Sequence, residues 1–169
     1  MTESEEISFY ENVYSTGCPA CNRKEPQPEG LDIVLETNNF RVHQDYALPI
    51  PGMMVVEVKR HVRSMTEFTD DEAIELTDVL IRTRNAMKEV GIEDATLVQE
   101  ERSSHFHAWW LPIYPWMKDI TGGKTRNIQS IFNHAKKNMV TDDNIRKVEE
   151  ITRQIKVSLD NSRLGNSRN

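Results

Sequence analysis

Apolar and polar residues alternate with a period of two in several short stretches of the chain. Residues 32–37 (DIVLET) and 40–46 (FRVHQDY) show this alternation on either side of an Asn-Asn pair, which predicts two strands joined by a turn. Residues 53–58 (MMVVEV) are almost wholly apolar and predict a third, more buried strand. Residues 95–100 (ATLVQE) and 105–111 (HFHAWWL) predict two further strands.

Two longer stretches have apolar residues at helical spacing. The first lies between Thr69 and Gly91, where Thr69 is a good N-cap, acidic residues follow it and the glycine ends the helix. The second runs over residues 142–159, and a basic stretch before it is also expected to be helical. The pattern predicts an α+β fold, with a mostly antiparallel sheet of about five strands, one central helix and helices at the C-terminus.

Length and charge narrow the class of protein. A chain of 169 residues has room for one domain with a real core, and its net charge of −6 argues against a protein that coats nucleic acid. No apolar run approaches the roughly 18 residues of a membrane span. The start of the chain, MTESEEIS, is acidic and does not resemble a secretion signal. We therefore expect a cytoplasmic protein whose partners include neither polymeric nucleic acid nor a membrane.

The only two cysteines, Cys18 and Cys21, form a CPAC motif. Such a pair is typical of a metal site, of a redox site or of two unpaired thiols in a loop. Prolines in residues 22–30 argue against the long helix that follows a thioredoxin-type motif. His61 and His105 would complete a Cys2His2 set for zinc, although a lone histidine such as His61 is most often merely a surface residue.

Residues 105–117 (HFHAWWLPIYPWM) contain two of the five histidines and all three tryptophans. In a strand, His105 and His107 would share one face at a separation of roughly 6.6 Å. Three interpretations remain open. Both rings bind one metal, or one ring binds a metal while the other is a free nucleophile, or the two form a hydrogen-bonded pair in the core.

Residues 16–117 resemble the histidine triad (HIT) superfamily of nucleotide hydrolases and transferases. The resemblance rests on CPAC, PIPGMMVVEVKRH and SSHFHAWWLP, in that order along the chain. It implies a HIT-like domain with an N-terminal zinc knuckle over residues 1–120, and a C-terminal helical extension over residues 121–169. It also implies a nucleotide or dinucleoside polyphosphate substrate, as in a diadenosine polyphosphate hydrolase, and a homodimer.

The resemblance also assigns roles to individual residues. In zinc-bearing members the corresponding ligands of a structural zinc are Cys18, Cys21, His61 and His105. His107 takes the place of the nucleophile that attacks the α-phosphate and forms a nucleotidyl-histidine. Asp45 corresponds to the ribose contact, with Tyr46 near the base.

The chain departs from the family pattern near the expected phosphate site. The third motif position, usually His or Gln, is Trp109, whose indole N–H donates a hydrogen bond but cannot transfer a proton. Met53 replaces the histidine of the usual PGH. Arg102 replaces a serine of the phosphate loop, where Ser103 and Ser104 follow as candidate phosphate contacts. Two alternatives therefore stand beside an enzyme of the HIT type: a HIT-fold binding protein with little turnover, and a metalloenzyme with His105 and His107 on a catalytic metal.

Overall fold

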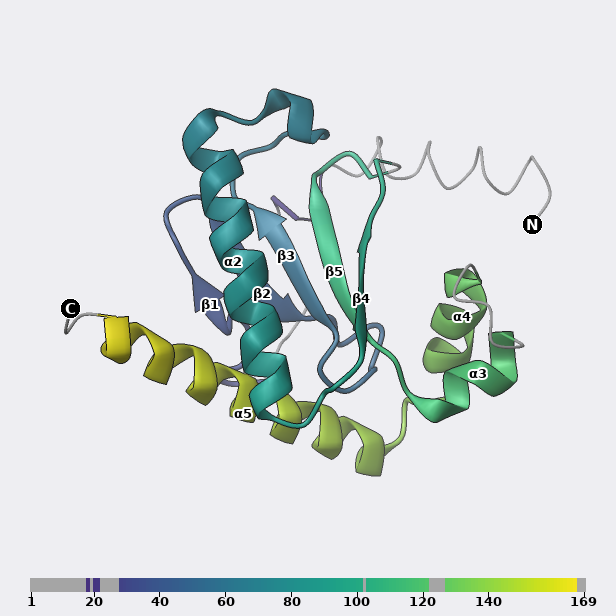
Figure 1. Ribbon diagram of the computed structural model, residues 1–169. Coiled ribbons are helices and arrows are strands. Elements are labelled where there is room, and N and C mark those ends of the chain that lie inside the picture. Colours follow the sequence, from purple (N-terminus) through teal and green to yellow (C-terminus); the bar gives the residue numbers. More distant parts are fainter. Residues whose placement is uncertain (1–17, 19, 22–27, 102, 122–126, 167–169) are drawn as a thin grey trace, which may run out of the picture.

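The computed structural model describes residues 18, 20–21, 28–101, 103–121 and 127–166. Five strands form one antiparallel sheet in the order β1-β2-β3-β5-β4 (Figure 1). The strands are β1 (Leu35–Glu36), β2 (Phe40–Gln44), β3 (Met54–Val58), β4 (Ala95–Gln99) and β5 (His107–Pro112). The predicted α+β fold with five antiparallel strands is confirmed.

A long helix, α2 (Asp70–Glu89), lies between β3 and β4 in the chain and packs on one face of the sheet. Its start is the one that the sequence predicts. Thr69 Oγ1 accepts a hydrogen bond from Glu72 N, and the Glu72 carboxylate accepts one from Thr69 N. Gly91 follows the helix with a φ of 86°, a left-handed conformation that favours glycine.

The remaining helices are η1 (Met65–Glu67), a single 3-10 turn, α3 (Pro115–Thr121), α4 (Ile128–Asn138) and α5 (Asp142–Asn166). Helix α5 packs on α2 and β1, and its Ile155 and Leu159 belong to the same core as the sheet. The division at residue 120 remains a prediction, but part of the proposed extension contributes directly to this core.

The bounds of β1 and β5 differ from those that the sequence pattern predicts. Strand β1 has two residues instead of six, because Thr37 N bonds to Phe40 O in the turn that follows. Strand β5 begins at His107 rather than at residue 105, because Phe106 N donates to Val62 O in the segment after β3 instead of joining the sheet. His105 therefore lies just before the strand.

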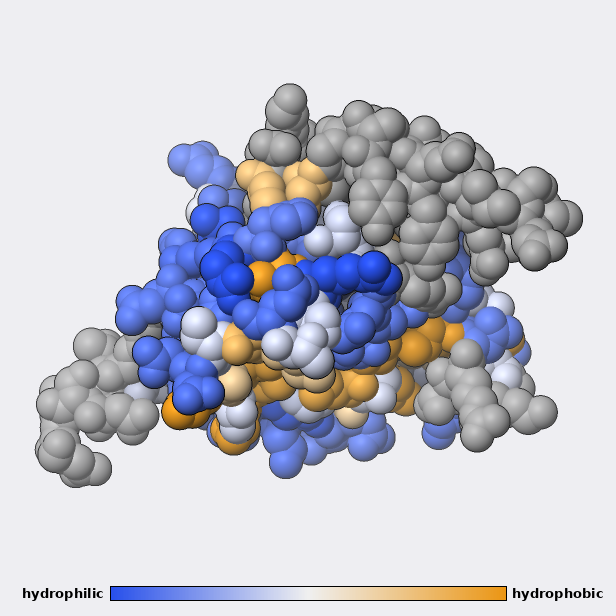
Figure 2. All heavy atoms as spheres, turned by 90° about the horizontal axis from the view of Figure 1, so that it is seen from above, coloured by the Kyte–Doolittle hydropathy of each residue, from blue (hydrophilic) through white to orange (hydrophobic). Residues whose placement is uncertain are grey.

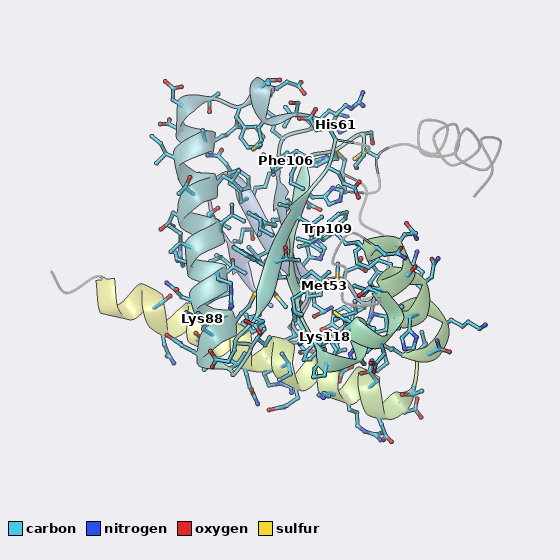
Figure 3. All side chains as sticks on the ribbon, turned by 45° about the vertical axis from the view of Figure 1, so that its right-hand side comes forward. Met53, His61, Lys88, Phe106, Trp109 and Lys118 are labelled. Carbon is cyan, nitrogen blue, oxygen red and sulfur yellow. The ribbon has the colours of Figure 1, made fainter. Side chains whose placement is uncertain are left out.

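The two faces of the sheet bury different sets of side chains. On the α2 face, Phe106 and the even-numbered residues of β2 and β3 form the main core. On the opposite face, Leu111 and Trp109 of β5 pack with Ile131 and Phe132 of α4 in a second cluster. Figure 3 shows this division, with Phe106 toward α2 and Trp109 toward α3 and α4.

The surface is largely hydrophilic where it can be seen from above, with apolar residues in smaller groups between charged ones (Figure 2). Among the described residues no helix combines the length and the apolar character needed to cross a bilayer.

Candidate functional site

Four metal-binding side chains meet at one end of the sheet. The ligand atoms of Cys18, Cys21, His61 and His105 all lie within 4.8 Å of one another. His105 Nδ1 is 3.3 Å from Cys18 Sγ and 3.5 Å from Cys21 Sγ, and His61 Nδ1 is 3.3 Å from Cys21 Sγ. Both cysteines are free thiols. The three distant segments named by the sequence therefore converge on one Cys2His2 cluster.

The local structure orients His105 toward the thiols. Its Nε2–H donates to Val58 O at 2.6 Å, so that Nδ1 is left as the ligand atom, and its ring is only 2% exposed. A backbone carbonyl on the second ring nitrogen is the usual way in which proteins orient a metal-binding histidine. The end of β3 thus supplies both the carbonyl that orients His105 and, three residues later, His61 itself.

The cluster fits a tetrahedral zinc ion. Zinc binds thiolates and imidazoles at distances that place neighbouring ligand atoms about 3.5 Å apart, and the three S···N separations are 3.3–3.5 Å. Four protein ligands leave no open position for substrate, as in a structural site.

His107 is oriented in a different way from His105. Its Nδ1–H donates to the carbonyl oxygen of His105 at 3.0 Å, which leaves Nε2 without a proton. Burial lowers the pKa of His107, and the nearby His105 and His43 act in the same direction, while the His105 carbonyl and Glu57 oppose them. His107 is not part of the four-residue metal cluster. Burial therefore favours the neutral imidazole, and in that form Nε2 is the ring nitrogen that carries no proton.

The pairing of the strands surrounds His107 with residues that the sequence analysis missed. Glu57 of β3 lies opposite both Arg41 of β2 and His107 of β5. Arg41 and His43 form ion-pair contacts with the Glu57 carboxylate, which is almost completely buried. The alternation in β2 and β3 was the available signal, since it places these polar residues on one face.

Trp109, at the third motif position, faces the same side as His107. The two rings are 4.7 Å apart between centroids, and Trp109 also contacts Phe132 of α4 edge to face at 5.8 Å. Helix α4 thus covers the side of the motif where a third histidine would lie. Met53 is fully buried in the second apolar cluster, to which Trp109 also belongs. This burial explains why residue 53 is apolar.

The other predicted site residues are more scattered. Asp45 Oδ1 accepts hydrogen bonds from Ala47 N and Leu48 N, and so forms the turn after β2. Burial raises the pKa of the Tyr46 phenol, which is influenced by charges of Glu149 and Arg153 on α5. The contacts of these two residues with a nucleotide remain predictions.

In the phosphate loop, Ser103 Oγ accepts a hydrogen bond from His105 N at 3.2 Å. Ser103 therefore bonds to the backbone of His105, a candidate metal ligand, while Ser104 beside it is partly exposed. Arg102 lies outside the described residues.

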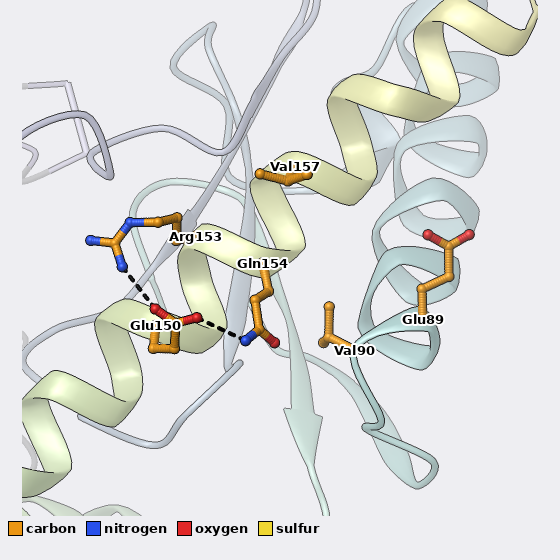
Figure 4. A pocket seen from close by; sticks show the side chains of 6 residues that line it. All are labelled: Glu89, Val90, Glu150, Arg153, Gln154 and Val157. Atoms are coloured by element: carbon orange, nitrogen blue, oxygen red, sulfur yellow. Dashed lines mark hydrogen bonds and ion pairs between the residues drawn. The ribbon is translucent and has the colours of Figure 1, made fainter.

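A hollow on another surface does not involve these residues (Figure 4). It lies between the end of α2 and α5, lined by Glu89, Val90, Glu150, Arg153, Gln154 and Val157. Glu150 already binds Arg153 and Gln154 there, so its charge is engaged within the protein. The side chains that could bind a metal or act as a nucleophile lie instead in the Cys2His2 cluster and at His107.

No family model and no curated protein matches the chain. Solved structures do match it. A HIT-like protein involved in cell-cycle regulation from Bartonella henselae is 16% identical, with a TM-score of 0.56 over 83% of this chain and 92% of that one. A zinc-bound histidine triad family protein from Mycobacterium smegmatis is 14% identical, with a TM-score of 0.54 over 96% of this chain and 99% of that one.

A uridylyltransferase mutant is also similar, with 19% identity and a TM-score of 0.64. The match covers 94% of this chain but 53% of the uridylyltransferase, so the chain spans about half of that enzyme's length. Together these structures show that the chain has the histidine triad fold, as the resemblance in sequence implied.

Proposed function

We propose that the chain is a member of the HIT superfamily and acts as a nucleotide hydrolase or nucleotidyltransferase. Its substrate would be a nucleoside phosphate ester or anhydride, with dinucleoside polyphosphates as candidates, and its intermediate a nucleotidyl-histidine. The observation that carries the proposal is the hydrogen bond from His107 Nδ1 to the His105 carbonyl. It prepares Nε2 of a buried, neutral imidazole for attack on phosphorus.

In the first step the lone pair of His107 Nε2 forms a bond to the α-phosphorus, and the bond to the leaving oxygen breaks. The positive charge that develops on the ring is stabilised by the His105 carbonyl and by the Glu57 carboxylate. In the second step water or another acceptor attacks the same phosphorus, and His107 is released in its original neutral form.

The proposal includes one structural zinc, bound by Cys18, Cys21, His61 and His105. When bound, the ion would supply a rigid cross-link between three segments rather than a Lewis acid for the reaction. The backbone carbonyl of His105, one of the proposed ligands, also accepts the hydrogen bond from His107. The metal would therefore act on the nucleophile only by positioning it.

A binding protein with little turnover is the second candidate, and Trp109 is the observation that favours it. An indole in contact with His107 cannot protonate a leaving group. A catalytic metal shared by His105 and His107 has less support, because His107 Nδ1 donates to a carbonyl and the ring is not part of the metal cluster.

Intact-mass spectrometry after mixing with substrate tests the proposal. A panel of dinucleoside polyphosphates, nucleoside phosphoramidates and nucleotide sugars should include one that adds a nucleoside monophosphate to the wild-type protein. His107→Gln should prevent the adduct, and the matched control His134→Gln, on α4, should retain it. An adduct that persists in His107→Gln, or none with any substrate, contradicts the proposal.

The proposal also includes a homodimer in the cytoplasm. Support for self-association comes from β4, which lies at the edge of the sheet, and from exposed apolar side chains on β4 and α2, Leu97 and Ile81. An edge strand with an exposed leucine is a surface that commonly pairs with another chain.

A further inference from the structure

Two imidazoles on the same face of the sheet are hydrogen-bonded in the same way. His107 Nδ1 donates to the carbonyl of His105 at 3.0 Å, and His43 Nδ1 donates to the carbonyl of Gln44 at 3.1 Å. In both rings Nε2 is therefore the nitrogen that does not bond to a backbone carbonyl. His43 Nε2 is buried, and within the described part of the chain it has no hydrogen-bond partner.

Strand register relates His43 to the third position of the motif. His43 lies opposite Val55, and Val55 lies opposite Trp109, so the three residues form one row across β2, β3 and β5. Arg41, Glu57 and His107 form the adjacent row on the same face. Strands on either side of a common neighbour are about 10 Å apart, so His43 and Trp109 flank Val55 from opposite sides on one face of the sheet.

Charged groups of both signs lie beside His43 and its neighbour Glu57. Glu57 Oε2 lies 3.7 Å from His43 Nε2, and the side chains are 7% and 12% exposed respectively. Arg41 lies 3.9 Å from the other Glu57 oxygen. An imidazole can both donate and accept a proton during a reaction, and histidine is the most frequent general acid or base in enzymes.

We propose that His43 is the proton donor to the leaving group, in place of the third histidine that Trp109 replaces. The inference rests on the proposed function of His107. As His107 Nε2 bonds to phosphorus, the bond to the leaving oxygen breaks with its electron pair, and that oxygen takes the proton from His43 Nε2. His43 becomes neutral with Nδ1–H still bonded to Gln44 O. It then accepts the proton of the attacking water or alcohol in the second step.

The test compares leaving groups in His43→Asn, a variant whose side-chain amide can still donate to Gln44 O but has no group at the Nε2 position. The two probes are the 4-nitrophenyl ester of AMP, whose leaving group departs without a proton, and the methyl ester of AMP, whose leaving group needs one. We expect adduct formation in single turnover to fall about 10²-fold or more with the methyl ester and to change little with the nitrophenyl ester. His134→Asn is the matched control.

A rescue variant separates proton transfer from a structural role. His43→Asn combined with Trp109→His should recover the methyl ester reaction, because an imidazole returns to the third position of the motif, across Val55 from residue 43. His43→Asn should keep the metal content and thermal midpoint of the wild type, whereas the double variant should keep the metal content but have a lower midpoint, because Trp109 packs against Phe132.

Equal losses with both esters, or a change confined to KM, would overturn the role of His43 and identify it as a binding or structural residue. In either case a wild-type adduct would leave the proposed function intact. If the wild-type protein forms no adduct with either ester or with the wider substrate panel, the proposed function fails and this inference fails with it.

Discussion

At His105 and His107, hydrogen bonds tie opposite ring nitrogens to backbone carbonyls. His105 uses Nε2 to reach Val58 O, which turns Nδ1 toward the thiols. His107 uses Nδ1 to reach His105 O, which leaves Nε2 available. Two histidines of one H-x-H motif thereby acquire different chemistry, since an imidazole donates through one nitrogen and binds or attacks through the other.

Replacing His105 and replacing His107 should have different effects on metal content and stability. His105→Ala removes a ligand of the proposed zinc, and we expect loss of the metal and a fall in Tm on the order of 10 °C, because metal binding contributes to folding. His107→Ala should keep one metal per chain and a Tm near that of the wild type. Elemental analysis and thermal denaturation check both, and equal metal loss in the two variants would contradict the division of roles.

The predicted ribose contact of Asp45 has a conservative test. Asp45 Oδ1 accepts the amide hydrogens of Ala47 and Leu48, and Asn at this position retains an oxygen that can do the same. Asp45→Asn should therefore keep the turn but weaken nucleotide binding about 10-fold, because hydrogen bonds from ribose hydroxyls to a charged acceptor are the stronger ones.

Calorimetric titration with ribonucleotides and 2′-deoxyribonucleotides measures the effect of Asp45→Asn. The loss should be smaller for the deoxy compounds, which have one hydroxyl fewer to offer. Unchanged affinity for both would exclude Asp45 as the ribose contact.

Among the elements, the start of α2 is joined to the segment that carries His61. Arg60 Nε and its terminal nitrogen donate to the two carboxylate oxygens of Glu72 at 2.9 and 2.8 Å. Glu72 also accepts from Thr69 N in the helix cap. The hydrogen bonds from Arg60 and Thr69 lower the pKa of Glu72 from 4.5 to about 2. One carboxylate therefore connects the helix cap to the residue that precedes His61.

Glu72→Gln should destabilise the protein at neutral pH by about 2 kcal/mol, because charge-assisted hydrogen bonds become neutral ones. Since the folded-state pKa lies below the ordinary value, the contribution of Glu72 is fully present above pH 4.5 and disappears as the pH falls toward 2. Denaturant unfolding should show a difference between variant and wild type at pH 7 that shrinks through this range. A difference independent of pH would contradict the assignment.

For the molecule as a whole, the edge strand β4 is the surface expected to mediate the proposed dimer. Leu97 is 45% exposed, and its pairing with Trp110 places it on the α2 face of the sheet, where Ile81 is 56% exposed. Trp110, on the neighbouring strand β5, donates to Leu80 O of α2. Leu97 and Ile81 are therefore the candidate apolar contacts of the proposed dimer.

Leu97→Lys should weaken self-association at least 10-fold, because a charge replaces apolar area at the contact. Sedimentation velocity over a concentration series measures the change. Val157→Lys, at an equally exposed apolar position on α5, is the matched control and should behave as the wild type. A wild-type protein that stays monomeric throughout the series would refute the dimer.

Local pattern was sufficient to predict much of this protein. Alternation of apolar and polar residues identified the strands, and Thr69 with its following acids identified the start of α2, because both signals depend on neighbours in the chain. The CPAC motif was compatible with a metal site, and the resemblance to the histidine triad superfamily implied Cys18, Cys21, His61 and His105 as its ligands. Cysteine and histidine side chains are able to bind a metal whatever fold surrounds them.

The relation between strands was decided only by the tertiary structure. Alternation shows which residues share a face of one strand, but strand order and register arise from pairing between distant segments. That pairing aligns His43 with Trp109 across Val55, and Glu57 with His107. It likewise places Val58 O on Nε2 of His105, a contact between residues 47 positions apart that only the fold can form.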